Sequence, residues 1–197
     1  MTTRCWDTRG GYAVSRLPAY PPRTAYSAFV ARPDLKGGGS AGTRATTALR
    51  TAGVEFVVHS YEHDPAAPSY GIEAAQALGI PPERVFKTLI VDTGAGLAVG
   101  IVPVDRQLDL KAIAQALRAK RTDLAAAAAA QRATGYVLGG ISPFGQTKTL
   151  PTVLDASAAE HATILVSAGR RGLDVELAPA DLVSVCRATV APIARTR

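Results

Sequence analysis

A single lysine stands inside an otherwise apolar segment, and its charge makes it the first candidate for chemistry. Residues 85–91 read Val-Phe-Lys-Thr-Leu-Ile-Val, a pattern typical of a buried strand. A lysine there can place its ammonium at the wall of a pocket, where it would meet a phosphate or a substrate oxygen. It can equally extend past the apolar surface into solvent. The pattern around Lys87 leaves both interpretations open.

The second candidate is a loop whose value lies in its backbone. Residues 134–145 read Thr-Gly-Tyr-Val-Leu-Gly-Gly-Ile-Ser-Pro-Phe-Gly and hold four glycines and one proline. Glycine permits positive φ and a close approach of other atoms, while proline fixes φ and donates no N–H. Such a loop can offer backbone amides to an anion or a developing oxyanion. A tight turn between two elements explains the same residues without any function.

The usual nucleophiles and metal ligands do not form a site in this sequence. His59 and His63 have the separation of ligands on one helix face, but they fall on a predicted strand and loop, and His161 is distant. Cys186 lies on the apolar face of a predicted helix, where a cysteine is most often a small core residue. The sequence contains neither a serine-nucleophile elbow nor a phosphate-binding loop that ends in Gly-Lys-Ser/Thr. We therefore expect no metal site.

The charge of the chain is concentrated at its N-terminal end. The net charge is +6, and residues 1–43 hold six bases and two acids, which leaves 16 bases and 14 acids after residue 43. This first segment has prolines and aromatic residues without a helix or strand period, and it ends near the run Gly-Gly-Gly-Ser at 37–40. We predict a disordered extension over 1–43, with a tRNA-binding tail as the alternative, and one folded domain over 44–197.

The cysteine content and the lack of long apolar runs indicate the cellular compartment of the protein. Only two cysteines occur, Cys5 and Cys186, which fits a reducing compartment better than a disulfide framework. No run approaches the roughly 18 apolar residues needed to span a bilayer, and the N-terminus has no apolar signal-peptide core. We expect a cytoplasmic protein that does not enter a membrane.

Alternating and helical patterns predict an α+β fold. Helices are expected before Gly53, from Ser69 to Gly79, after Asp109, over an alanine run at 125–130 and from Pro179. Strands are expected over 54–58, 85–91, 97–104, 152–154, 164–166 and 173–177, with turns at 93–96 and 168–172. Adjacent hairpins with a few helices indicate a mixed, mostly antiparallel sheet.

Six collinear motifs resemble the YbaK/EbsC family of Cys-tRNA(Pro) deacylases, the free-standing relatives of the editing domain of bacterial prolyl-tRNA synthetases. They occupy residues 59–64 (HSYEHD), 86–89 (FKTL), 107–111 (QLDLK), 130–132 (AQR), 134–145 and 167–177 (SAGRRGLDVEL). The resemblance implies that family's fold, a curved sheet or barrel with flanking helices. It covers about residues 44–195 and leaves the N-terminal segment outside.

The resemblance also implies a reaction that needs no protein nucleophile, metal or cofactor. In the family, the thiol of a mischarged cysteine is thought to attack its own ester carbonyl and leave as a cyclic thiolactone. An intramolecular attack gains from proximity, so the protein mainly orients the ester and stabilises the oxyanion. The implied partners are mischarged tRNA, here Cys-tRNA(Pro), and prolyl-tRNA synthetase.

The family's functional positions can be carried onto this sequence one at a time. Lys87 matches a lysine that binds near the terminal adenosine and the ester, and Gly139 matches a backbone amide donor toward the carbonyl oxygen. The resemblance places Tyr61, Ser167 and Asp174 around the amino acid. It gives Thr88 a weaker place on the same wall and implies that Gly140 helps to shape that wall.

Two alternatives remain at the level of the sequence. An editing relative could act on another small amino acid such as alanine, since a small pocket cannot fully reject a near-isostere. A non-catalytic module that binds tRNA or a synthetase would belong to a different class. The folded part carries a charge of only about +2, which indicates a weak intrinsic affinity for tRNA and favours a synthetase that supplies tRNA selectivity.

Overall fold

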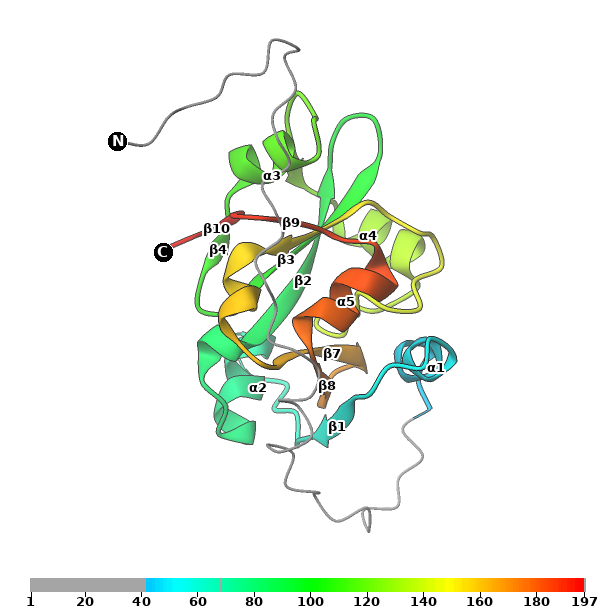
Figure 1. Ribbon diagram of the computed structural model, residues 1–197, viewed down its shortest axis with the longest axis vertical. Coiled ribbons are helices and arrows are strands. Elements are labelled where there is room, and N and C mark those ends of the chain that lie inside the picture. Colours follow the sequence, from blue (N-terminus) through cyan, green and yellow to red (C-terminus); the bar gives the residue numbers. More distant parts are fainter. Residues whose placement is uncertain (1–41, 68, 197) are drawn as a thin grey trace, which may run out of the picture.

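A mixed β-sheet organises residues 42–67 and 69–196, the part of the chain that the computed structural model describes (Figure 1). The prediction for residues 1–43 falls almost entirely outside this part. The sheet contains β1 (Val57–Ser60), β2 (Val85–Asp92), β3 (Leu97–Pro103), β5 (Asp123–Leu124), β6 (Thr152–Asp155), β7 (Ile164–Arg170), β8 (Leu173–Leu177) and β9 (Thr189–Ala191). Two short strands, β4 (Gln107–Leu108) and β10 (Ala194–Arg195), pair separately.

The order of the strands confirms the predicted α+β class. It runs β1-β8-β7-β2-β3-β6-β9, with β5 as a further partner of β2. The β2·β3 and β7·β8 hairpins and the β1·β8 pair are antiparallel, whereas β2·β7, β3·β6 and β6·β9 are parallel. The sheet is therefore mixed, and its described strands form an open sheet that ends at β1 and β9 rather than a barrel.

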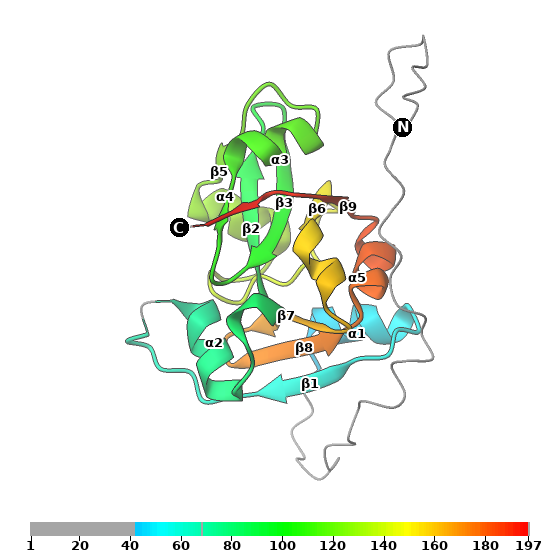
Figure 2. The same ribbon diagram turned by 60° about the vertical axis from the view of Figure 1, so that its left-hand side comes forward.

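In the part of the chain that the structure describes, five α-helices and two short 3₁₀ helices surround the sheet (Figure 2). They are α1 (Arg44–Thr51), α2 (Tyr70–Leu78), η2 (Pro82–Arg84), α3 (Leu110–Ala116), α4 (Ala127–Thr134), η3 (Ala156–Glu160) and α5 (Pro179–Cys186). Local signals explain several of their ends: Thr43 and Thr46 form a capping box, the Asp109 carboxylate accepts from two backbone N–H groups of α3, and Gly79 ends α2 with a φ of 64°. None of the helices in the described residues is long and apolar enough to cross a bilayer.

The core lies on both faces of the sheet. The largest cluster joins α1, α4 and α5 to one face through residues such as Leu49, Ala130 and Leu182. On the other face, Ala74 and Ala75 of α2 pack against strand residues. A third cluster buries Ile113 of α3 beside β3 and β6. Each of these helices thus packs an apolar face against the sheet.

Four local expectations are wrong in detail. The alanine run begins its helix at Ala127, because the residues just before it form the short strand β5 and pair with β2. The first strand begins at Val57, later than the alternation suggested. Ser69 precedes α2, but its side chain makes no capping hydrogen bond. Residues 168–170 continue β7 through a bulge, so the turn shortens to Arg171 and Gly172.

One edge of β2 is interrupted, and this interruption positions the site. On that edge β7 pairs with Val85 and Phe86, while β5 pairs with Val91 and Asp92. The opposite edge pairs with β3 over residues 86–92. Residues 87–90 therefore lie at a gap in the strand pairing on that edge, and all four line a cavity there.

Candidate active site

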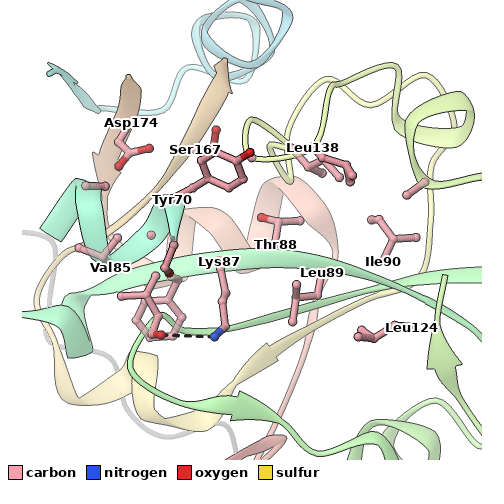
Figure 3. A pocket seen from close by; sticks show the side chains of 18 of the residues that line it. Tyr70, Val85, Lys87, Thr88, Leu89, Ile90, Leu124, Leu138, Ser167 and Asp174 are labelled. Carbon is pink, nitrogen blue, oxygen red and sulfur yellow. Dashed lines mark hydrogen bonds between the residues drawn. The ribbon is translucent and has the colours of Figure 1, made fainter. Parts of the chain in front are cut away.

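A cavity of about 350 Å³ opens at this gap (Figure 3). Its walls come from β2, the start of α2, the β7·β8 hairpin and the glycine-rich loop that follows α4. Six of the seven sequence-predicted site residues line it: Tyr61, Lys87, Thr88, Gly139, Ser167 and Asp174. A volume of this size is at the lower end of the range typical of small-ligand sites.

The seventh residue, Gly140, does not line the cavity. It is buried behind the cavity wall, where an added Cβ would lie 2.9 Å from the Cα of Arg170 in the β7 bulge. Its N–H donates to the carbonyl oxygen of Val137 at 3.1 Å. Gly140 therefore seats the loop against β7 and shapes the cavity only indirectly, since a side chain at this position would push the loop away from the strand.

Lys87 reaches the cavity from β2, and its ammonium is held by backbone carbonyl groups. Nζ donates to the carbonyl oxygens of Arg106 at 2.5 Å and Val104 at 3.3 Å. Figure 3 shows the Lys87 and Thr88 side chains leaving β2 on opposite sides, as strand alternation requires. The solvent-facing interpretation of Lys87 is wrong: the side chain is half-buried and fixed at a cavity wall.

Gly139 occupies a position that only glycine fits. Its φ is +81°, and an added Cβ would lie 2.8 Å from the Tyr70 ring. The preceding carbonyl, that of Leu138, accepts two hydrogen bonds from the Arg171 guanidinium, at 3.0 and 3.1 Å. That guanidinium also lies 4.8 Å from the centre of the Tyr70 ring. Among the described residues, no group accepts a hydrogen bond from the Gly139 N–H.

Thr88 contributes a hydroxyl without a partner. Its Oγ1 is buried, and no described residue bonds to it. A buried unpaired hydroxyl costs free energy, and a cavity wall is the place where a ligand can satisfy it. Its neighbours Phe86 and Ile90 face the core on the same side of β2. The side chain is thus fixed by a strand and available for a ligand.

The cavity mouth has an apolar rim that the sequence patterns did not indicate. Tyr70, Leu124 and Leu138 line the cavity and are among the large apolar side chains that are exposed in the described residues. Tyr70 is the first residue of α2, so only its helix-start position was visible in the sequence. An aromatic ring beside exposed leucines at a cavity mouth is a surface on which a nucleobase can stack.

Comparisons with known proteins agree with this geometry. A model of the aminoacyl-tRNA editing domain family matches residues 64–185, more than half of the chain. The chain belongs to the aminoacyl-tRNA editing domain family. A relative in Enterococcus faecalis (strain ATCC 700802 / V583), EbsC, carries the name of a candidate Cys-tRNA(Pro)/Cys-tRNA(Cys) deacylase. It is 39% identical over 120 residues, which cover 60% of this chain and 73% of EbsC.

Solved structures share the fold of this editing domain. One is described as a candidate trans-editing enzyme for prolyl-tRNA synthetase, with a TM-score of 0.67 and 24% identity over 77% of this chain and 95% of the other. A second, of a hypothetical protein, has a TM-score of 0.69 and 24% identity over 78% of this chain and all of the other. The family and the fold predicted from the sequence motifs are thereby confirmed.

One carboxylate of the editing domain is buried at the cavity, where its negative charge lowers the stability of the fold. Asp174 of β8 lies opposite Ser167 of β7 in the antiparallel register and is only 6% exposed. Burial raises its pKa to about 6, although the nearby His59 opposes the shift. Tyr61 has a pKa raised to about 12 by burial and by the charges of Asp174 and Glu73, so its hydroxyl stays protonated. The cavity thus offers one acidic group and several hydroxyls.

The histidines and the cysteine serve other purposes. His59 Nε2 lies 2.8 Å from Glu176, and His63 Nδ1 lies 3.0 Å from Glu73, which ties the segment after β1 to α2. Burial raises the pKa of the Cys186 thiol to about 12, which makes it a poor nucleophile. Within residues 42–67 and 69–196, no cluster of three potential metal ligands occurs.

Proposed function

We propose that this chain is a trans-editing enzyme that removes cysteine from Cys-tRNA(Pro). The observation that carries the proposal is the cavity beside β2, which has no competent protein nucleophile and is lined by a buried carboxylate, by an unpaired hydroxyl, and by a glycine whose N–H has no acceptor among the described residues. A substrate that supplies its own nucleophile suits such a site. The name of EbsC and the family membership support the same substrate class.

In the proposed reaction the cysteine thiol attacks its own ester carbonyl. A carbon–sulfur bond forms, the bond from that carbon to the ribose oxygen breaks, and the thiol proton ends on the ribose hydroxyl. The products are the cyclic thiolactone and deacylated tRNA. Gly139 N–H donates to the carbonyl oxygen as negative charge develops, which is where a preorganised donor lowers the barrier. The cavity walls hold the thiol near its carbonyl carbon.

Asp174 supplies the recognition of the amino acid in this proposal. The substrate carries an α-ammonium group, and the causes that set the pKa of Asp174 include no hydrogen bond to its carboxylate. A ligand ammonium would provide the compensating charge that the protein provides only weakly through His59. Ser167 and the Thr88 hydroxyl complete the polar contacts. Lys87 carries a fixed positive charge toward the ribose and phosphate end of the ester.

A deacylation assay with purified protein tests the proposal. Protein at a hundredth of the substrate concentration should release cysteine from Cys-tRNA(Pro) without an added cofactor. Lys87→Ala should lower kcat/KM on the order of 100-fold. Lys148→Ala is the matched control because Lys148 is exposed and lines neither this cavity nor its neighbour. Release only at stoichiometric protein would instead indicate a binding module.

A panel of charged tRNAs resolves the substrate. Serine on tRNA(Pro) has a hydroxyl in place of the thiol and should be released far more slowly than cysteine. Equal release of serine would contradict the thiol-assisted reaction, and faster release of alanine would assign the chain to the alternative editing activity. Because the name of EbsC includes Cys-tRNA(Cys), the panel also compares cysteine on the two tRNAs.

Selectivity for tRNA(Pro) is proposed to come from prolyl-tRNA synthetase. Residues 44–197 carry a charge of only about +2, which limits their own hold on tRNA. The synthetase should be retained on the immobilised protein only when tRNA is present. An affinity for tRNA that the synthetase leaves unchanged would contradict this partnership. Such a protein would act where aminoacylation takes place, in the cytoplasm.

The segment before Thr43 is proposed to be dispensable for the reaction. Thr43 caps α1 and therefore belongs to the folded domain. A chain that begins at Thr43 should deacylate Cys-tRNA(Pro) within about twofold of the full chain, because every proposed site residue lies beyond position 60. A tenfold loss would instead support the tRNA-binding tail.

A further inference from the structure

A second cavity adjoins the first one along β2. It has a volume of about 710 Å³, and Lys87, Leu89 and Leu124 line both cavities. The remaining walls come from β4, the segment that begins α3, and β10. The two cavities therefore adjoin at these side chains of β2 and β5.

The second cavity carries more positive than negative charge. Lys111 and Arg195 line it together with Lys87, whereas its single acidic residue is Asp109. The Asp109 carboxylate is occupied locally, since its Oδ1 accepts from the backbone N–H groups of Lys111 at 2.8 Å and Ala112 at 3.0 Å. Lys111 and Arg195 are both exposed, so their charges are available to a ligand that enters from solvent.

Arg195 is positioned by the fold. It lies opposite Gln107 in the antiparallel β4·β10 pair, and its Nη2 donates to the Gln107 side-chain oxygen at 3.1 Å. This pairing brings the end of the described chain back to the segment just before α3, as Figures 1 and 2 show. A guanidinium held by a strand pair loses less conformational freedom on binding than one on a loose tail.

The apolar part of this cavity suits a base or a ribose. Leu89, Leu108 and Leu110 line it, and Leu124 stands at the boundary with 61% of its surface exposed. A cavity that combines an apolar floor with cations at its edge matches a single-stranded nucleotide, whose base buries apolar surface while its phosphate meets the cations.

We propose that the second cavity binds the nucleotide that precedes the terminal adenosine of the tRNA, with its phosphates against Lys111 and Arg195. This inference rests on the proposed function, because it assumes that the ester occupies the first cavity. The RNA strand must leave the ester from its ribose, and Lys87 marks the point where the two cavities meet. Lys87 then faces the ribose–phosphate junction between the two nucleotides.

The test compares two substrates and three variants. The substrates are Cys-tRNA(Pro) and the cysteinyl ester of adenosine alone, which cannot reach the second cavity. Lys111→Glu and Arg195→Glu reverse the cavity charges. Arg50→Glu is the matched control, since it makes the same change in net charge on α1, at the opposite end of the molecule in Figure 1.

Each cavity variant should lower kcat/KM for Cys-tRNA(Pro) about tenfold, mainly through KM, and reduce the salt dependence of log KM by about one unit of slope. Neither should change cleavage of the adenosine ester more than about twofold, and Arg50→Glu should change neither substrate. Equal losses on both substrates, or none on the tRNA, would overturn the second site while the deacylase proposal stands.

A binding measurement separates the two proposals. A fluorescent, uncharged oligonucleotide with the tRNA 3′ sequence is titrated with the full chain and each variant. We expect weaker binding in Lys111→Glu and Arg195→Glu than in Arg50→Glu. Binding that depends on these cations in a protein that releases no amino acid would support the nucleotide site and contradict the deacylase proposal. Binding that ignores them would overturn the nucleotide site.

Discussion

Two carboxylates lie two residues apart on strand β8, and their surroundings shift their pKa values in opposite directions. Asp174 faces the cavity and has a pKa raised to about 6 by burial. Glu176 has a pKa lowered to about 2, first by its hydrogen bond with His59 and then by contacts that include Thr163 and Arg84. Strand alternation places both side chains on one face of β8, so the difference lies in what surrounds them.

Glu176 belongs to a network of hydrogen bonds and ion pairs that stabilises the fold. Its carboxylate oxygens lie 2.8 Å from His59 Nε2 and 2.8 Å from Arg84 Nη2, and it also accepts from the Thr163 hydroxyl. This network joins β8 to β1 and to the segment before β2. For Asp174, only the charge of His59, its neighbour on β1, offsets the cost of burial. One strand thus holds a carboxylate that stabilises the fold and another that costs stability, and the costly one lies at the cavity.

The largest expected change in the free energy of unfolding comes from Asp174→Asn. Because the folded pKa of Asp174 lies above its unfolded value of 3.8, the buried charge lowers stability as pH rises toward 6, and the full cost is present above pH 6. Removing the charge should raise the free energy of unfolding at pH 7 by roughly 2–3 kcal/mol. Urea unfolding at pH 7 and at pH 4 measures this gain, which should fade at the lower pH. A destabilised variant at pH 7 would contradict the account.

Glu176→Gln should have the opposite sign and a smaller size. The folded pKa of Glu176 lies below its unfolded value of 4.5, so its stabilising charge is present above pH 4.5 and is lost as pH falls toward 2. We expect a loss of about 1–2 kcal/mol at pH 7, with deacylation at 25 °C unchanged. Glu160→Gln, at an exposed position, is the control and should alter neither quantity.

The pH dependence of activity sharpens the comparison further. If the Asp174 carboxylate binds the substrate ammonium, kcat/KM for Cys-tRNA(Pro) should fall below about pH 6, where this group takes up a proton. The fall should approach tenfold per pH unit. Initial rates between pH 5 and 7 measure it. If Asp174→Asn showed the same fall in kcat/KM below pH 6, another group would be responsible for it.

Cys186→Ala should have the smallest effect. The half-buried thiol lies beside Pro143, its pKa is raised to about 12, and it does not line either cavity. Deacylation should stay within about twofold of the parent, because the proposed nucleophile belongs to the substrate. A loss of activity in a variant with unchanged unfolding would point to a protein thiol instead.

Much of this arrangement was predictable from the sequence, and the exceptions have physical reasons. The helix ends at Gly79 and Asp109 follow local rules, and the two hairpins follow from alternation around short turns. The cap at Thr43 lies inside the segment predicted as a disordered extension. Strand β5 was missed because two residues carry no period and pair only when β2 leaves an edge open. The bulge in β7 was missed because a bulge depends on its partner strand.

Some features of the site were also predictable from the sequence, whereas others depend on the fold. The family motifs brought Lys87, Gly139, Ser167 and Asp174 together, which periodicity alone could not do. The sequence does not indicate Tyr70 as a site residue, because an aromatic residue at the start of a helix has no distinctive pattern. The raised pKa of Asp174 also depends on burial by segments distant in sequence. The resemblance implies that Gly140 helps to shape the wall, whereas its Cα faces the β7 bulge.

The most direct test is the rate at which Asp174→Asn releases cysteine from Cys-tRNA(Pro) at pH 7.5. This variant is expected to be more stable than the parent, so a lost rate cannot be attributed to unfolding. The account predicts a loss of kcat/KM on the order of 30-fold or more, since one partner of a buried charge pair is removed. A rate within about twofold of the parent would contradict the assignment of this cavity as the site of deacylation.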